Sequence, residues 1–156
     1  PASVWFTKQF PEHKWVEFLD QLEFDGQVYF VGAPSDRDLC DRIIKANQKN
    51  IGKNLCGEMS LLESAALMKD AEMNYVNDSA PQHICSALDA PVTAVFCSTI
   101  PEFGFGPLSS NSRVVQTNQK LDCRPCGLHG HKECPKGHFK CADTIDVSEL
   151  NFAEQD

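Results

Sequence analysis

Short apolar runs alternate with amphipathic segments along most of the chain. The apolar runs are rich in Val, Ile, Phe and Tyr, and they predict strands at 3–7, 27–32, 53–57, 73–78, 92–98 and 113–117. Between the first five runs, apolar residues recur at helical spacing over 12–22, 36–49, 60–71 and 80–88. Strands that alternate with helices of this length predict an α/β fold, a doubly wound, Rossmann-like parallel sheet with helices on both faces.

The pattern changes after residue 99. A loop rich in Gly, Pro and Phe leads to the strand at 113–117, and a cysteine-rich segment follows at about 119–144. From residue 145 the pattern predicts one last helix, with Ser148 as a candidate cap. A chain of 156 residues is the size of one domain, so 1–156 is interpreted as a single unit with a cysteine-rich excursion.

Composition narrows the class of protein. The net charge of -8 argues against a nucleic-acid binder, which would carry a surplus of Lys and Arg. The sequence holds no apolar run long enough to span a membrane and no secretory signal pattern, which predicts a cytoplasmic protein. Four cysteines lie singly in apolar surroundings, as small buried hydrophobic residues do. These are Cys40, Cys56, Cys85 and Cys97.

Ligands of doubly wound sheets bind beyond the carboxyl ends of the strands. Polar residues follow the predicted strands at 7–8, 32–36, 77–83 and 98–101. Neither G-x-G-x-x-G nor G-x-x-x-x-G-K-[ST] occurs, so the dinucleotide and P-loop interpretations lose their main support.

The stretch "VNDSAPQH", residues 76–83, joins a predicted strand to a predicted helix. Asp78 and Ser79 are residue types that cap helices, and Pro81 suits a first helical turn. The first amides of a helix lack intrahelical partners and lie at the positive end of the helix dipole, so they can hold an anion such as phosphate.

In this interpretation the amides of Ala80 and Gln82 face a diphosphate, and His83 donates to a phosphate oxygen. The alternative is an ordinary capped helix in which His83 is a surface or core imidazole. The motif alone leaves both open.

Three further residues have a binding interpretation beside an ordinary one. Lys8 follows the first predicted strand and can reach a diphosphate as a point charge, or it is a solvated lysine. Asp36 can accept from ribose hydroxyls or cap its helix. Met59 can pack on a flat base or belong to the core.

The cysteine-rich segment has the spacing C-x2-C-x7-C-x6-C. The C-x2-C pair suits one edge of a tetrahedral zinc site, so the candidate ligands are Cys123, Cys126, Cys134 and Cys141, with His138 as a substitute for the fourth. Free thiols or two disulfides are the alternatives. The surrounding Lys and Arg residues favour thiolates, and they equally favour an anionic acceptor.

Three segments together resemble a known family. "TKQFPEHKW", "GEMSLLESAALMKDAEMNYVNDSAPQHICSALDAPVTAVFCSTIPEFGFGPLS" and "LDCRPCGLHGHKECPKGHFKCADTI" are similar to the C-terminal half of the heptosyltransferases, glycosyltransferase family nine. The resemblance implies the second Rossmann-like domain of a GT-B type enzyme, which holds a nucleotide-sugar donor, typically ADP-heptose.

The resemblance also implies roles for individual residues. Met59 would lie against the adenine, and Asp78 would bind the sugar. The residues placed around the donor phosphates are Lys8, Ser79, Ala80 and His83.

The sequence departs from the family pattern at three positions. Ala80 and Cys97 stand where the family usually has Gly, and the segment around Asp36 lacks the usual Glu, which weakens Asp36 as a ribose ligand. These departures leave the exact donor open.

For the whole enzyme the resemblance implies inverting glycosyl transfer to a lipopolysaccharide core acceptor, with no cofactor required. The acceptor domain and its carboxylate base would lie in an N-terminal domain absent from this chain, so the chain alone is predicted to be inactive. A peripheral position at the inner membrane fits the same resemblance. The alternative function is a non-catalytic binding module with a cysteine-rich, zinc-holding interaction surface.

Overall fold

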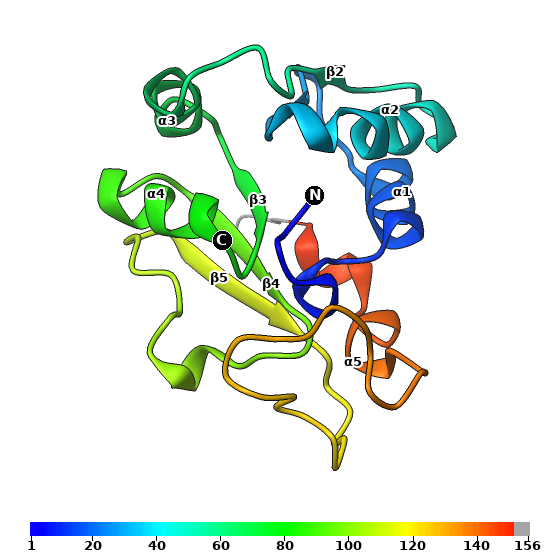
Figure 1. The fold of residues 1–156 in the computed structure, drawn as a ribbon. Coiled ribbons are helices and arrows are strands. Elements are labelled where there is room, and N and C mark those ends of the chain that lie inside the picture. Colours follow the sequence, from blue (N-terminus) through cyan, green and yellow to red (C-terminus); the bar gives the residue numbers. More distant parts are fainter. Residues whose placement is uncertain (152–156) are drawn as a thin grey trace.

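The computed structural model describes residues 1–151 as an α/β arrangement in which every strand pairing is parallel (Figure 1). β1 (Tyr29–Phe30) pairs with β2 (Lys53–Asn54). A second sheet has the order β3 (Asn74–Asn77), β4 (Val92–Phe96), β5 (Ser112–Gln116). The parallel α/β prediction is confirmed, but the described strands form two sheets rather than one.

β4 is the central strand of the larger sheet. Its residues pair with β3 from Asn74↔Val92 and with β5 from Val92↔Ser112, and all of them are buried. Val95 packs into one apolar cluster, whereas Ala94 and Phe96 pack into another on the opposite face. The sheet is therefore covered on both sides, as the continuous apolar run of β4 predicts.

The strand predicted at 3–7 does not form. The chain there is irregular and ends in the 3-10 helix η1 (Phe6–Lys8). The Asn77 amide donates to the carbonyls of Pro1 and Ala2, and its oxygen accepts from the Phe10 N–H at 3.0 Å. Asn77 thus holds the chain on both sides of residues 3–7, and no strand forms within that segment.

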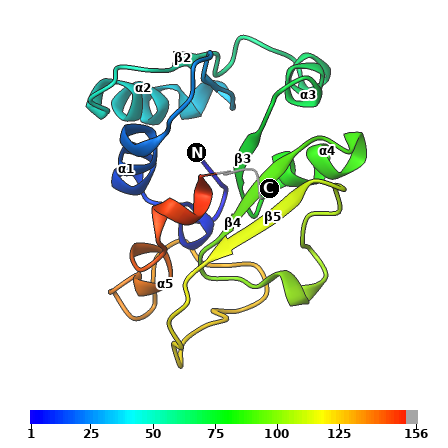
Figure 2. The same ribbon diagram turned by 180° about the vertical axis from the view of Figure 1, so that it is seen from behind.

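The space between β1 and β3 remains open. The N-terminus lies there in both ribbon views (Figures 1 and 2). A cavity of about 1690 Å³ occupies this region and is lined by Phe18, Phe30 and Tyr75 among others. This opening separates the two sheets.

The four predicted helices are confirmed with small changes at their ends. They are α1 (Glu12–Gln21), α2 (Arg37–Ala46), α3 (Leu61–Lys69) and α4 (Ala80–Leu88). α1 buries Trp15, Phe18 and Leu19 at helical spacing. The start of α3 is a capping box, because Ser60 N–H donates to Glu63 Oε2 at 2.8 Å and Glu63 N–H donates to Ser60 Oγ at 3.3 Å.

Short helical turns complete the chain. η2 (Pro34–Asp36) precedes α2, η3 (Pro101–Phe103) follows β4, and the unpredicted α5 (Lys140–Asp143) lies in the cysteine-rich segment. In place of the predicted last helix the structure has the 3-10 helix η4 (Val147–Leu150). Its cap is the Asp146 carboxylate, which accepts from Ser148 N–H at 3.0 Å, so the Ser148 cap was wrong. The remainder of the predicted helix, 152–156, lies outside the described residues.

None of the helices in residues 1–151 is both long and apolar enough to cross a membrane.

Candidate functional site

A buried ion pair lies where β3 ends. Asp78 directly follows β3 and is 4% exposed. Its Oδ2 accepts from Lys8 Nζ at 2.7 Å and from Thr99 Oγ1 at 2.6 Å. A buried carboxylate is tolerated only when it is paired and hydrogen-bonded. The structure thus brings together Lys8 and Asp78, and it adds Thr99, which the sequence indicated only as part of 98–101.

The two oxygens of Asp78 have different surroundings. Both donors, Lys8 and Thr99, meet Oδ2, and Oδ1 accepts no hydrogen bond from the described residues. A carboxylate oxygen can accept more than one hydrogen bond, so Oδ1 keeps the capacity to accept one.

The start of α4 differs from the predicted cap. Ser79 occupies the N-cap position, but its hydroxyl donates to the Asn77 carbonyl at 3.3 Å instead of capping the helix. The Gln82 N–H donates to the Ser79 carbonyl at 3.0 Å, so the expectation that this amide faces a ligand was wrong. The exposed Ala80 has no acceptor for its amide within residues 1–151.

His83 is exposed on the first turn of α4. Its ring stands edge-on to Phe105, with 6.4 Å between the ring centroids. The neighbouring Gln82 is fully buried and donates to the Phe105 carbonyl, while its Oε1 has no partner in the described part of the chain. The loop after β4 therefore packs against the helix start and leaves the imidazole accessible.

Asp36 and Met59 lie apart from this pair. Asp36 accepts from Ala33 N–H at 2.9 Å and from Ser35 Oγ at 3.2 Å, so it caps its own turn. It lines the large cavity, as do Ser79 and Ala80. Met59 is half-buried before α3 and is not among the residues that line this cavity. Within residues 1–151, Met59 shares no ion pair, helix start or cavity lining with the other predicted donor residues.

The cysteine-rich segment covers the carboxyl end of β4 (Figure 1). Arg124 Nε donates to the Cys97 carbonyl at 2.7 Å, and Cys126 N–H donates to the Ser98 carbonyl at 2.8 Å. On its other side, Thr7 N–H donates to the His131 carbonyl at 3.1 Å. The segment is thus bonded both to the loop after β4 and to the helical turn that carries Lys8.

The thiols of this segment have unequal environments. Burial raises the pKa of Cys141 to about 11, and the nearby thiol of Cys134 adds to this. At Cys134 burial acts in the same direction, but backbone N–H groups that include that of Phe139 outweigh it and lower the pKa. Hydrogen bonds to sulfur favour the thiolate. Cys134 is therefore more readily ionised than Cys141.

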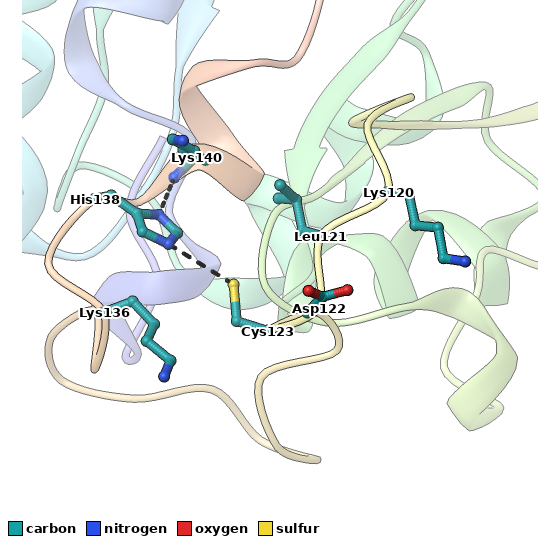
Figure 3. A pocket seen from close by; sticks show the side chains of 7 residues that line it. All are labelled: Lys120, Leu121, Asp122, Cys123, Lys136, His138 and Lys140. Atoms are coloured by element: carbon teal, nitrogen blue, oxygen red, sulfur yellow. Dashed lines mark hydrogen bonds between the residues drawn. The ribbon is translucent and has the colours of Figure 1, made fainter.

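The metal site stays a prediction. Cys123 Sγ lies 3.9 Å from His138 Nε2, but no group of three or more Cys, His, Asp or Glu side chains in residues 1–151 is placed to hold an ion. Figure 3 shows the adjoining cavity of about 370 Å³, whose rim carries Lys120, Lys136 and Lys140. The zinc ligands predicted from spacing, Cys123, Cys126, Cys134 and Cys141 with His138 as substitute, are not assembled around one point.

Comparison with known protein families decides where the chain belongs. The model of glycosyltransferase family 9 (heptosyltransferase) matches residues 1–137. The chain belongs to glycosyltransferase family 9. This match includes Lys8, Met59 and the 76–83 motif, and it ends inside the cysteine-rich segment.

Curated family 9 relatives include lipopolysaccharide heptosyltransferase 2 of Salmonella typhimurium, which is 31% identical over 114 residues. The enzyme of the same name from Escherichia coli is 30% identical over 114 residues. Each alignment covers 70% of this chain and 32% of the relative. The chain therefore spans about a third of the length of these relatives.

Solved structures support the same assignment. E. coli ADP-heptose lipopolysaccharide heptosyltransferase II has a TM-score of 0.68 and 27% identity, covering 81% of this chain and 41% of that one. E. coli heptosyltransferase WaaC with ADP has a TM-score of 0.63 and 26% identity, covering 72% and 35%. The family and the GT-B type α/β fold predicted from the sequence are confirmed, and the roles of single residues stay predictions.

Proposed function

We propose that this chain is the donor-binding part of an ADP-heptose-dependent glycosyltransferase whose acceptor is a lipopolysaccharide core. The observation that carries the proposal is the placement of Lys8 against Asp78 at the start of α4, beside an amide of Ala80 that has no acceptor in the described residues. The names of the relatives and the ADP in one structural neighbour support the same donor class.

The site suits a departing diphosphate. The N-terminus of α4 provides a positive dipole end, and the ammonium of Lys8, paired on one side with Asp78, supplies N–H donors beside it. His83 is exposed on the same turn and can donate to a phosphate oxygen. Groups fixed in this way stabilise the charge that develops on a leaving ADP without rearranging.

Asp78 suits the sugar. Its Oδ2 is occupied by Lys8 and Thr99, and its Oδ1 can accept from a sugar hydroxyl. The base and the acceptor site of the proposed reaction belong to the whole enzyme, so donor binding without turnover is expected from these 156 residues. Peripheral attachment at the inner membrane would follow from a lipopolysaccharide acceptor.

ADP titration tests the proposal. We expect ADP to raise the thermal stability of the chain, and we expect Lys8→Ala and His83→Ala each to weaken ADP binding about tenfold, the effect of losing roughly 1.4 kcal/mol. Lys45→Ala, on the exposed surface of α2, and His13→Ala, on α1, are the matched controls.

Two results would contradict the proposal. One is thermal stability that does not respond to millimolar ADP, which would favour the non-catalytic binding module. The other is ADP binding that is equally weak in the test variants and in the Lys45 and His13 controls.

A further inference from the structure

Thr99 is the second donor to the buried carboxylate. It is 1% exposed and lies beyond the end of β4, and its hydroxyl donates to Asp78 Oδ2 at 2.6 Å. Lys8 reaches the same oxygen at 2.7 Å. Lys8 is the more mobile group, because its side chain has more rotatable bonds and is 16% exposed. The rigid, buried Thr99 is therefore the partner that fixes the orientation of Asp78.

The cysteine-rich segment in turn holds the backbone of Thr99. Arg124 Nη2 donates to the Thr99 carbonyl at 2.8 Å and to Gln116 Oε1 at 2.7 Å. Its Nε donates to the Cys97 carbonyl at 2.7 Å. These carbonyls have left the β4 ladder, which ends at Phe96, so they need other donors. A planar guanidinium can span them at once, whereas an ammonium cannot.

The loop after β4 also contacts η1, the turn that carries Lys8. Ser98 N–H donates to the Thr7 carbonyl at 3.2 Å, and Ser98 Oγ donates to Thr7 Oγ1 at 3.1 Å. Residues 98–99 therefore connect the cysteine-rich segment to Asp78, and they also contact the turn that carries Lys8.

We propose that Thr99 is a positioning residue that orients Asp78 toward the donor sugar, and that Arg124 holds Thr99 in place. The inference rests on the proposed donor-binding function. In this proposal the cysteine-rich segment affects sugar binding indirectly, because its Arg124 fixes the loop after β4 that carries Thr99.

The inference makes a selective prediction. If Asp78 receives the sugar, a misplaced carboxylate weakens ADP-heptose binding more than ADP binding, because ADP lacks the sugar. Thr99→Val keeps the shape and removes only the hydroxyl, whereas Thr99→Ser keeps the hydroxyl. A hydrogen bond to a charged group is strong enough for about a tenfold loss of affinity.

Calorimetric titration of the 156-residue chain with ADP-heptose and with ADP tests this. We expect Thr99→Val to bind ADP-heptose about tenfold more weakly with ADP affinity nearly unchanged, and Thr99→Ser to resemble the unmodified chain. Arg124→Lys should show the same selective loss. Thr117→Val is the matched control, because Thr117 is also a buried threonine whose hydroxyl bonds a side chain, that of Thr144 at 2.6 Å.

The outcomes separate the two proposals. If the unmodified chain binds neither ligand, the donor-binding function fails and the positioning role fails with it. If it binds both, and Thr99→Val matches Thr99→Ser or weakens ADP and ADP-heptose equally, only the positioning role is overturned. Equal losses in Thr99→Val and Thr117→Val would also overturn it.

Discussion

The two sheets of this molecule differ in the burial of their strands and in the length of their strand pairing. In the β3–β4–β5 sheet, every residue of β4 is buried, β5 pairs along its whole length and β3 pairs from Val92 to Val95. In the β1–β2 sheet, the ladder joins two residues from each strand, and Tyr29 is 44% exposed. The first sheet is packed on two faces and meets the large cavity at its edge strand β3, whereas the second sheet is a short ladder whose strand β1 lines the same cavity.

The predicted ligand residues divide in the same way. Lys8 and Asp78, assigned to phosphate and sugar, meet at the end of the packed sheet. Asp36 and Met59, assigned to ribose and adenine, lie on the β1–β2 side, where Asp36 caps its own turn. Groups held by close packing are preorganised for a ligand. Of the predicted ligand residues, those assigned to the diphosphate and the sugar are therefore the more firmly held ones.

The largest expected effect on stability comes from truncating buried Phe residues in the two apolar clusters. Phe96→Ala should lower the free energy of unfolding by about 3–5 kcal/mol, because Phe96 is fully enclosed between the sheet and its helices. Phe30→Ala should cost clearly less, because Phe30 already borders the cavity. Urea unfolding measures both, and equal losses would contradict the difference between the sheets.

The buried ion pair should have the next largest effect. Asp78→Asn removes the charge that compensates Lys8, and we expect a loss of about 2–3 kcal/mol, since breaking a buried pair strands the other charge. Glu12→Gln, which breaks the exposed pair with Arg42, should change the free energy of unfolding by less than about 1 kcal/mol. Similar values for the two variants would show that burial does not set the strength of the Lys8–Asp78 pair.

The capping box that starts α3, the helix between β2 and β3 in the sequence, should have a smaller effect. Ser60→Ala removes the hydroxyl that accepts from Glu63 N–H at the start of α3, and we expect a loss of about 1 kcal/mol. Ser64→Ala, one turn later in the same helix, is the control, and chemical denaturation is the measurement. Equal losses would mean that helix propensity rather than the cap is responsible.

The smallest expected effect is a pH dependence of stability that comes from Asp89, the residue at the end of α4. Asp89 accepts from Ser110 N–H at 2.6 Å and from Ser110 Oγ at 3.1 Å, and these hydrogen bonds hold its pKa below the ordinary value of 3.8. A carboxyl group with a lowered pKa in the folded state stabilises the fold above pH 3.8, and this contribution is lost as the pH falls through the folded-state value.

Asp89→Asn should therefore be less stable than the unmodified chain at pH 7, and the difference should shrink below about pH 4. Asn also tolerates the positive φ of 53° at this position, so backbone strain does not obscure the comparison. Thermal melts at a series of pH values measure the effect. A difference that is constant with pH would exclude the Asp89 carboxylate as its source.

Local patterns predicted the helices well and the first strand badly. The helical spacing of Trp15, Phe18 and Leu19 already specifies a buried face, so α1 could be placed to within a residue. Residues 3–7 have strand-like composition, but a strand also needs a paired strand beside it. Here the backbone of Thr7 bonds His131 and Ser98, which lie in irregular segments. The Ser148 cap was wrong for a different, local reason, because Asp146 caps the turn two residues earlier.

The amino-acid sequence by itself determined the family and the parallel α/β class, and it supplied the candidate donor residues that stay predictions. Only the tertiary structure decided that Lys8 and Thr99 share one oxygen of Asp78, and that Arg124 stands behind them. These groups come from separate segments of the chain, and periodicity reports only which face of an element is apolar. Which side chains meet is set by how the loops beyond the strands pack, and no local pattern encodes that contact.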